Sequence, residues 1–583
     1  MFTKKNFLFL FLFAVFVTLA VIVWAMNKGF NLSDEGFYIA GYDRLIEFPF
    51  WLSAFKFLTV NTFSKIGSGL IYFRIIRLVL TITGSLFLSF TLWGLLKKFN
   101  FIKNKNEKRT LISLSLFCLM GSLAGYGLGP QTLSYNHYTL FFGNLFLGLI
   151  FLGFTNSDNR KKNMLISAAL GIVCGLEFFV KIPTTILLSF LFLSMQFILF
   201  KQLRWFSIIN SFIFALFAIL AFSFISFPSS PKSILNEYYY VISFISKFYT
   251  HDVNYVIKNY IVGFNDFWDS HLINYVPHLF FLVMSLIFSF QNKYLSIKKV
   301  GNFLFLLIST AMVYSLYSKG YFLSGSKHNG TAPLIYIIFI FLFSILFFFH
   351  FVPRKKGLLS DFFLEKIFAG LALLFFPIIC AMGTGNYLQV QILFFINTWF
   401  LFIYLVYAFS GFEKSDFNIP ISILLIAITG KSIIDVFSGI ALDPYKINGH
   451  LWEQTEALKM QASGETIFID KELMSTIQKL KPLMESQNSD ALFTSSELIG
   501  LSYVFNKKLI GYGWYDSGIS PKEFFYQSYN QSALKEKNNI CFMLLSAENN
   551  YKIFDYLNDK KINSKLVTLP WGNDSIFVYS RHN

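Results

Sequence analysis

Runs of about 20 apolar residues recur along this chain from residue 7 to residue 440. The hydrocarbon core of a bilayer is about 30 Å thick, and a helix needs roughly 20 residues to cross it. Of the 583 residues, 55% are hydrophobic and only 14% are charged, which is a membrane composition and not a globular one. Most of the chain is therefore predicted to form helices embedded in lipid.

The apolar runs predict about thirteen spans. They start near Phe7, Ile71, Leu111, Tyr138, Met164, Pro183, Trp205, Leu272, Asn302, Ala332, Ile367, Leu388 and Ile419. Lys4 and Lys5 precede the first run, and no small-residue cleavage site follows it before Asn27. We therefore predict an uncleaved first span and not a signal peptide.

Lys and Arg fall mainly in short clusters between apolar runs, which accounts for a net charge of +17 without a nucleic-acid partner. With the N-terminus inside, every dense cluster lies in an inner loop, as the positive-inside rule requires. These clusters lie near residues 97–109, 160–162, 201–204, 293–299 and 354–356. An odd number of spans then places the tail after Leu442 outside, and one miscounted span would reverse that side.

The predicted architecture is a polytopic α-helical membrane protein with a small soluble domain. Residues 1–442 form the transmembrane domain, whose long outer loops 27–70 and 228–271 are predicted to hold interfacial helices along the membrane surface. Residues 443–583 have an ordinary soluble composition and alternate strand-like and helix-like segments, which predicts an extracytoplasmic α/β domain. The predicted strands are Ala491–Thr494, Lys508–Gly511, Ile540–Leu545 and Lys565–Leu569, and the predicted helices are Glu472–Glu485 and Tyr551–Asn558.

Metal and disulfide chemistry is not indicated. The four cysteines show no zinc spacing and no disulfide framework. His251-Asp252 and the segment from Asp266 to His271 contain ligand-type residues, but no ordered second His pair or cysteine accompanies them. The soluble tail contains no phosphate loop, paired-His motif or nucleophile elbow, so we expect a cap or acceptor-recognition module there. No cofactor is predicted.

The sharpest chemical feature is the motif Asp34-Glu35-Gly36-Phe37-Tyr38, which follows the first span within ten residues on the predicted outer face. Transfer of a sugar from a polyprenyl phosphate requires one carboxylate to accept the acceptor's proton and cations to hold the departing phosphate. That leaving group is already a weak base and needs no general acid. The competing interpretation of Asp34 and Glu35 is a solvated loop, or an N-cap at Ser33-Asp34 for a surface helix starting near Gly36.

The acidic pair, its position and the predicted topology resemble the GT-C superfamily, particularly protein O-mannosyltransferases and aminoarabinose transferases acting on lipid A. Asp34 and Glu35 match the acidic motif of that family, and Arg74 or Arg77 matches the basic residue entering its second span. The resemblance implies an inverting glycosyltransferase with a lipid-linked donor, acting at the outer surface with Asp34 as the base. Glu35 is then expected to act in catalysis by orienting the acceptor or the nearby cations. The resemblance covers the whole chain in layout but only a few residues in motif.

The resemblance also implies cations for the donor phosphate. Lys181 lies before Pro183 at an outer end between two apolar runs, where a charge must reach water or an anion; snorkelling to the interface is the competing interpretation. Lys319 and Lys327 lie in an outer loop whose spacing departs from the family pattern. With Arg74 and Arg77, these lysines form the predicted phosphate set.

Further polar residues are candidates for the acceptor or sugar. They are Tyr38, Asn136, His137 and His328. For Asn136 and His137, a hydrogen-bonded helix start explains the residues equally well. The segment from Pro444 to Trp452 either links the last span to the tail or lines the cleft.

Two other functions fit a multi-span protein acting on lipid-linked glycans. A transporter or flippase predicts charged residues in mid-span and an internal repeat; the sequence shows no repeat, and Asp435 is a charge near the last span's outer end. An O-antigen-type polymerase or ligase places its chemistry late in the membrane region, whereas the acidic motif comes first here. The 76 Phe residues and the excess of Lys over Arg indicate a bacterial coding sequence, so the expected location is the bacterial inner membrane. The sugar, its carrier and the acceptor are not specified by the sequence.

Overall fold

The computed structural model describes residues 4–46, 55–102, 107–199, 204–226, 253–291, 295–323, 331–351, 363–409, 418–486, 491–510, 540–545, 564–571 and 574–581. Within these residues, nine helices are long and apolar enough to cross a membrane, or up to ten if one bent pair counts as a span. The nine spans are carried by α1 (Lys4–Ala25), α4 (Leu70–Lys98), α5 (Glu107–Ala124), α6 (Tyr135–Thr155), α7 (Arg160–Val180), α9 (Trp205–Ser226), α12 (Val276–Gln291), α13 (Leu295–Ser318) and α18 (Asn418–Phe437). The chain is thus a polytopic helical membrane protein.

Four further apolar helices correspond to the remaining predicted spans. Two of them, α8 (Ile182–Leu199) and α14 (Leu334–Phe351), are shorter, and α15 (Phe363–Ala381) contains Pro377 in its interior. The fourth is a bent pair: α16 (Leu388–Ile392) continues through η8 (Leu393–Phe395), and the chain then bends by 67° into α17 (Asn397–Phe409). Each predicted span begins in or beside a helix, but the total of about thirteen spans stays a prediction.

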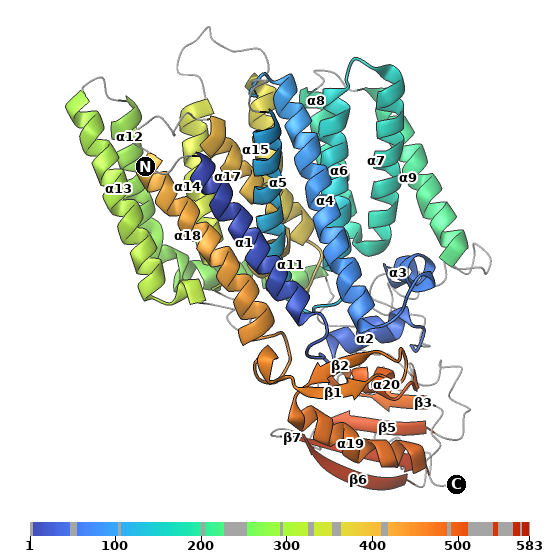
Figure 1. Ribbon diagram of the computed structural model, residues 1–583. Helices are drawn as coiled ribbons and strands as arrows, with labels where there is room; N and C mark the ends of the chain where they lie inside the picture. The colour runs from blue at the N-terminus through green and yellow to red at the C-terminus, as the bar shows by residue number, and fades with distance from the viewer. Residues whose placement is uncertain are drawn as a thin grey trace.

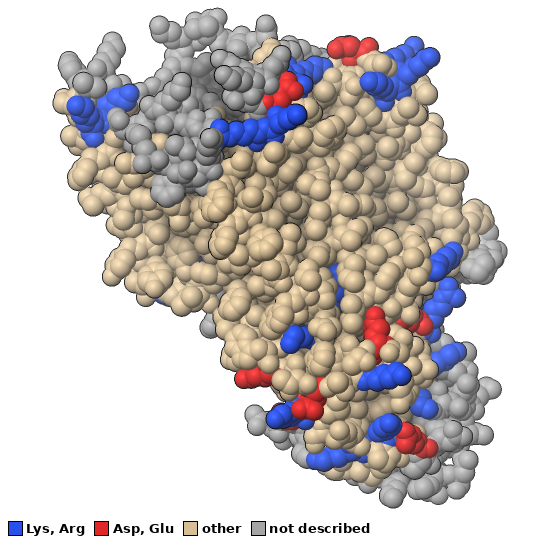
Figure 2. Space-filling model, viewed as in Figure 1, with Lys and Arg blue, Asp and Glu red and all other residues tan. Residues whose placement is uncertain are grey.

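The bundle has a lipid-compatible surface. On the face drawn in Figure 2, charged side chains gather at the end remote from the C-terminal domain and reappear near that domain, and a band without charge lies between them. Such a band is what contact with hydrocarbon requires. At the remote end, Lys97 pairs with Glu107 at 3.0 Å. α1 also begins at that end and runs toward the C-terminal domain (Figure 1).

In its described residues, the C-terminal domain combines a hairpin, a mixed sheet and two α-helices. β1 (Glu456–Lys459) and β2 (Thr466–Ile469) pair antiparallel. The second sheet has the order β4-β3-β5-β7-β6 and comprises β3 (Ala491–Thr494), β4 (Lys508–Leu509), β5 (Ile540–Leu545), β6 (Ser564–Trp571) and β7 (Asp574–Arg581). β3 runs parallel to β4 and β5, whereas β7 runs antiparallel to β5 and β6. The helices are α19 (Lys471–Ser486) and α20 (Gly500–Val504).

All four predicted strands and one predicted helix therefore have counterparts in this domain. The predicted strand at 508–511 is shorter, since β4 ends at Leu509. The predicted helix Tyr551–Asn558 lies outside the described residues. Short apolar runs located these strands, because a run of four to eight apolar residues between turn-forming residues is typical of a strand.

The segment that follows α1 lies between the helical bundle and the C-terminal domain (Figure 1). It carries α2 (Asp34–Tyr42) and α3 (Phe55–Asn61). Every residue of α2 is buried, so this helix is covered by protein and is not a membrane-surface helix. In the second predicted loop, α11 (Val253–Ser270) is described, whereas residues 227–252 are not.

Backbone pairing joins this first segment to the C-terminal domain at three places. Gly29 N donates to Phe468 O at 2.7 Å, and Phe468 N donates to Asn27 O at 2.8 Å. Gly500 N donates to Leu32 O at 2.6 Å, and Leu509 N donates to Leu45 O at 2.7 Å. The segment after α1 and the C-terminal domain consequently lie at the same end of the bundle, whatever the number of spans between them.

Glycine permits the closest of these approaches. A Cβ atom at Gly36 in α2 would lie 2.5 Å from the backbone nitrogen of Gly500 in α20, which no packed structure tolerates without movement. We expect Gly36→Ala to destabilise the junction by about 1–3 kcal/mol because backbone, and not a flexible side chain, would have to yield. The melting temperature of the purified full-length protein in detergent measures this effect.

The matched control is Gly430→Ala in α18, where a Cβ atom would meet nothing within 4 Å. Alanine favours a helix over glycine by roughly 1 kcal/mol, so this variant should melt at the wild-type temperature or above it. Equal melting temperatures for the two variants would contradict the proposed backbone contact.

Candidate functional site

The Asp34-Glu35 motif starts α2, and Asn31 fixes that start. Asn31 Oδ1 accepts hydrogen bonds from Ser33 N at 2.9 Å, Ser33 Oγ at 2.8 Å and Asp34 N at 3.1 Å. Ser33 itself makes no side-chain capping bond, and Asp34 is only 6% exposed. The motif is therefore neither a solvated loop nor a helix start capped by Ser33. Asparagine stabilises this turn because its side-chain oxygen can accept hydrogen bonds from backbone N–H groups two and three residues ahead.

Glu35 forms a fully buried ion pair with Arg74 of α4. Arg74 Nη2 lies 2.7 Å from Glu35 Oε2, Arg74 Nε lies 3.2 Å from Oε1, and both side chains have zero exposure. Glu35 Oε2 also accepts from Asn31 N at 3.2 Å. The two-pronged geometry is the one that a guanidinium and a carboxylate favour.

The rest of the Arg74 guanidinium binds backbone carbonyls after α1. Nη1 donates to the carbonyls of Met26 at 3.0 Å and Lys28 at 2.9 Å, and Nη2 donates to Gly29 O at 2.9 Å. Every nitrogen of Arg74 therefore has a protein acceptor. Arg74 anchors the chain as it leaves α1, and no N–H group remains for the phosphate that the sequence assigned to it.

Arg77, one turn further along α4, is also fully buried. Nη1 donates to Pro130 O at 2.8 Å, Nη2 donates to Tyr126 O, and the guanidinium stacks 3.6 Å from the Tyr126 ring. Arg77 thus ties α4 to the chain between α5 and α6, and the predicted phosphate contact is not part of this arrangement.

The N-terminus of α4 is held by a residue of the C-terminal domain. Gly69, with a φ of +102°, precedes α4, and Glu465 Oε2 accepts from Ile71 N at 3.3 Å. A carboxylate is favoured at a helix N-terminus because the first N–H groups have no partner within the helix. Sequence reasoning missed Glu465, since it lies 394 positions from its partner.

Asp34 points toward the turn that follows the last span. Asp34 Oδ2 pairs with Lys446 Nζ at 3.2 Å, and Tyr445 forms a side-chain hydrogen bond with Asp34. Asp34 Oδ1 is buried and has no hydrogen-bond partner within the described residues. A carboxylate oxygen left unpaired in a buried place is costly unless a ligand completes it. The turn after the last span therefore contacts the acidic motif and is more than a linker to the C-terminal domain.

Three tyrosines surround this carboxylate. Tyr38 and Tyr445 both interact electrostatically with Asp34, and Tyr135 at the start of α6 does so as well. Burial, and then neighbouring charges including Asp34, raises the pKa of Tyr38 and of Tyr445 well above that of a free phenol. Both phenols stay protonated at neutral pH and can donate hydrogen bonds. Neutral phenol rings beside one carboxylate suit a polyhydroxylated ligand.

Tyr135 also connects Asp34 to the predicted cation Lys181. The Lys181 ammonium lies 6.0 Å from the Tyr135 ring centroid and 5.6 Å from that of Phe395. It donates to Cys380 O at 2.8 Å and Ala381 O at 3.3 Å, at the C-terminal end of α15. Lys181 is 5% exposed, so it does not snorkel to an interface. The structure thus brings Asp34 and Lys181 to the same tyrosine.

The other predicted ligands are distributed differently. His137 Nδ1 accepts from Ser134 N at 3.1 Å, so His137 closes the hydrogen-bonded start of α6. Asn136 is buried, and its Oδ1 has no partner among the described residues. Lys319 is exposed at the end of α13, 5.3 Å from the Tyr275 ring. Lys327 and His328 lie outside the described residues, which contain no group of three metal-ligating side chains.

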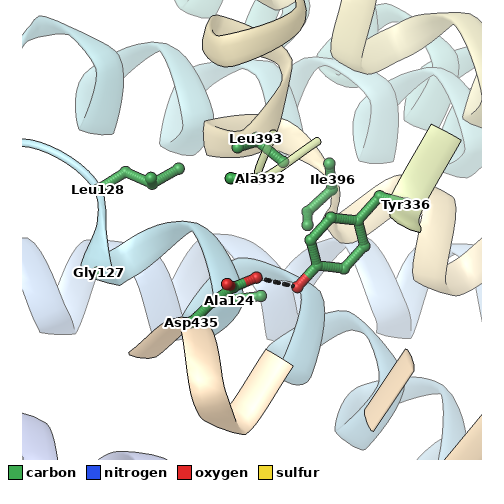
Figure 3. A pocket seen from close by; sticks show the side chains of 8 residues that line it. All are labelled: Ala124, Gly127, Leu128, Ala332, Tyr336, Leu393, Ile396 and Asp435. Carbon is green, nitrogen blue, oxygen red and sulfur yellow. Dashed lines mark hydrogen bonds between the residues drawn. The ribbon is translucent and has the colours of Figure 1, made fainter. Parts of the chain in front are cut away.

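A small pocket lies elsewhere, between the helices. Tyr336 of α14 donates to Asp435 Oδ2 of α18 at 2.6 Å across this pocket (Figure 3). Lys431, one turn earlier in α18, pairs with Asp435 and has zero exposure. The remaining lining residues are Ala124, Gly127, Leu128, Ala332, Leu393 and Ile396. This charged pair in α18 is separate from the contacts made by Asp34.

No known protein family, curated protein or solved structure matches this chain. The site must therefore be interpreted from its own geometry.

Removal of the Arg74 charge should be strongly destabilising. Arg74→Met leaves Glu35 buried without its counter-ion and frees several carbonyls, which costs about 3–5 kcal/mol. We expect a clearly lower melting temperature in detergent than for Lys471→Met, a charge change at an exposed position of α19. The double variant Glu35→Gln/Arg74→Met should recover part of the loss, because no unpaired charge then remains. A single variant as stable as the control would contradict the anchoring role.

Two carboxyls of the junction predict pH-dependent stability. Burial raises the pKa of Asp43, which accepts from Tyr503 at 2.6 Å, and burial also raises the pKa of Glu465. A raised folded pKa means that the folded protein holds more protons than the unfolded chain, so stability falls as pH rises through the folded values. We expect a higher melting temperature at mildly acidic pH than at pH 7.

The variant Asp43→Asn/Glu465→Gln should flatten this pH dependence, since neither replacement ionises. Glu497→Gln, at an exposed position before α20, serves as the control and should retain the wild-type slope. A double variant with an unchanged slope would show that other groups cause it.

Proposed function

We propose that this protein is an inverting glycosyltransferase that moves a sugar from a polyprenyl phosphate donor to a lipid, glycan or protein acceptor. The observation that carries the proposal is Asp34: a buried carboxylate that has one oxygen without a partner among the described residues, lies among three tyrosines and pairs with Lys446. Lys181 lies 6.0 Å from the ring of one of these tyrosines, Tyr135. It lies at the end of the bundle where the C-terminal domain covers α2. A carboxylate so placed can accept a proton from a bound ligand.

In the proposed reaction, an acceptor hydroxyl or amine attacks the anomeric carbon while Asp34 Oδ1 takes its proton. The new bond to the sugar forms as the bond from the anomeric carbon to the phosphate oxygen breaks. The polyprenyl phosphate leaves with the bonding electron pair, and the configuration at the anomeric carbon of the sugar is inverted. Lys181 would balance charge on the phosphate, with Lys319 assisting, because preorganised cations stabilise charge that develops in the transition state.

Two predicted roles change in this proposal. Glu35 positions α2 through Arg74 and does not itself contact the acceptor. Arg74 and Arg77 form the wall behind the acidic motif, where their nitrogens bind carbonyl groups. Tyr38 and Tyr135 are proposed to contact the sugar, since aromatic rings with polar tips suit its apolar faces and its hydroxyls.

The proposed location follows from the charge pattern of the sequence. With the N-terminus in the bacterial cytoplasm, the first span ends outside, and both Asp34 and the C-terminal domain lie in the extracytoplasmic space. The acceptor would then approach from the C-terminal domain, and the donor would enter from the outer leaflet.

Transport of a lipid-linked sugar is a second candidate, and the buried Lys431–Asp435 pair with Tyr336 favours it. Charged groups inside membrane bundles are expensive and are usually functional. A transporter would depend on this pair in α18 and would not require Asp34 to accept a proton.

Asp34→Asn should lower transfer by about 10²–10⁴-fold, the usual contribution of a general base. The measurement is transfer of labelled sugar from a polyprenyl phosphate donor in membranes containing the full-length protein. Asp158→Asn, an exposed change at the remote end of the bundle, should leave transfer intact. Full activity of Asp34→Asn would refute the proposed base. The transporter would be favoured if the protein moved the donor across a vesicle membrane but transferred no sugar, and if Asp435→Asn, but not Asp34→Asn, abolished that movement.

A further inference from the structure

The turn from Pro444 to Ile447 carries Lys446 to the acidic motif. Ile447 N donates to Pro444 O at 3.2 Å, and Ile447 is buried at the position that a Cβ atom of Gly29 would fill. Lys446 has a φ of +52°, a conformation that residues other than glycine rarely adopt. The turn is thus fixed at both ends, and its two central side chains reach Asp34.

Lys446 and Asp34 are buried to very different extents. The Asp34 side chain is 9% exposed, whereas that of Lys446 is 48% exposed. Lys446 Nζ contacts Asp34 Oδ2 and Ser33 Oγ, each at 3.2 Å. Its long stem and exposed position leave the ammonium able to swing, while Asp34 is held in α2. The Lys446 ammonium is therefore more accessible to an anionic ligand than the Asp34 carboxylate is.

We infer that Lys446 is a ligand for the donor phosphate and that Asp34 holds it until that phosphate arrives. This inference rests on the proposed transferase function. In an inverting reaction the base and the departing phosphate lie on opposite faces of the sugar, so one ammonium cannot hold both. Lys446 exchanges its partner from the carboxylate to the phosphate, and donor binding frees the second oxygen of Asp34.

The exchange makes Asp34 and phosphate competitors for one cation. Loss of Lys446 must weaken phosphate binding, because a charge-assisted hydrogen bond is lost. Loss of the Asp34 charge must strengthen phosphate binding, because the internal competitor is gone. In a protein that lacks Lys446, removal of the Asp34 charge must have little effect on phosphate binding, since no lysine is then held by Asp34. A lysine that only supports the fold does not give this pattern.

The test measures equilibrium binding of a labelled polyprenyl monophosphate to the purified full-length protein in detergent. We expect Lys446→Gln to weaken binding by about tenfold or more. Asp34→Asn should tighten binding several-fold, and the double variant should bind like Lys446→Gln. Lys446→Arg should retain most of the affinity, and Lys459→Gln, an exposed change in β1, should match the wild type.

A parallel arm with inorganic phosphate separates the headgroup from the lipid. If the variants change the affinity for inorganic phosphate in the same directions, and inorganic phosphate binds more weakly than the polyprenyl monophosphate, Lys446 recognises the phosphate group of a lipid-linked ligand. If the variants change the affinity for inorganic phosphate but not for the polyprenyl monophosphate, the donor role of Lys446 is overturned. Unchanged binding in Lys446→Gln, or weaker binding in Asp34→Asn with normal melting temperatures, would overturn the exchange.

This outcome is independent of the transfer assay. If Asp34→Asn retains transfer while the binding cycle holds, the proposed base is wrong and Lys446 remains a phosphate ligand. If transfer is lost in Asp34→Asn and the binding cycle fails, the transferase stands without the exchange.

Discussion

The buried ion pair between Glu35 and Arg74 determines the geometry of everything around the acidic motif. Two opposite charges removed from water are stable only when nearly every lone pair and N–H group is satisfied. Here Arg74 meets Glu35 with two nitrogens and meets the carbonyls after α1 with the remaining N–H groups. The end of the first span, the start of α2 and the body of α4 are thereby joined at one point.

That point is reinforced from the C-terminal domain. Glu465 binds the N-terminus of α4, while Phe468 pairs with the backbone around Gly29 and Gly500 packs against Gly36. The residues that make these contacts are 394 or more positions apart in the sequence. The domain is thus a structural part of the candidate site as well as a cover for it. This shared construction explains why α2 is wholly buried although it lies outside the spans.

The site itself is composite. Asp34 comes from the segment after α1, Tyr135 from the start of α6, Lys181 from the end of α7, and Lys446 from the turn after α18. Two of the predicted cations, Arg74 and Arg77, instead stabilise the wall by binding carbonyl groups. A guanidinium buried in a helical bundle needs many acceptors, and backbone carbonyls at helix ends provide them. The cations proposed to meet the phosphate are therefore lysines: the buried Lys181, the exposed Lys319 and the half-exposed Lys446.

The sequence alone determined that this is a helical membrane protein, roughly where its apolar helices lie, and where most described strands of the C-terminal domain lie. Those properties depend on apolar run length and on periodicity within a few residues. It also singled out Asp34 as a candidate, because an acidic pair follows the first span within ten residues. Only the tertiary structure decided that Glu35 belongs to Arg74, that Asp34 faces Tyr445 and Lys446, and that Glu465 holds α4. Such pairings depend on how distant segments pack, and local sequence patterns carry no information about which buried charge will find which partner.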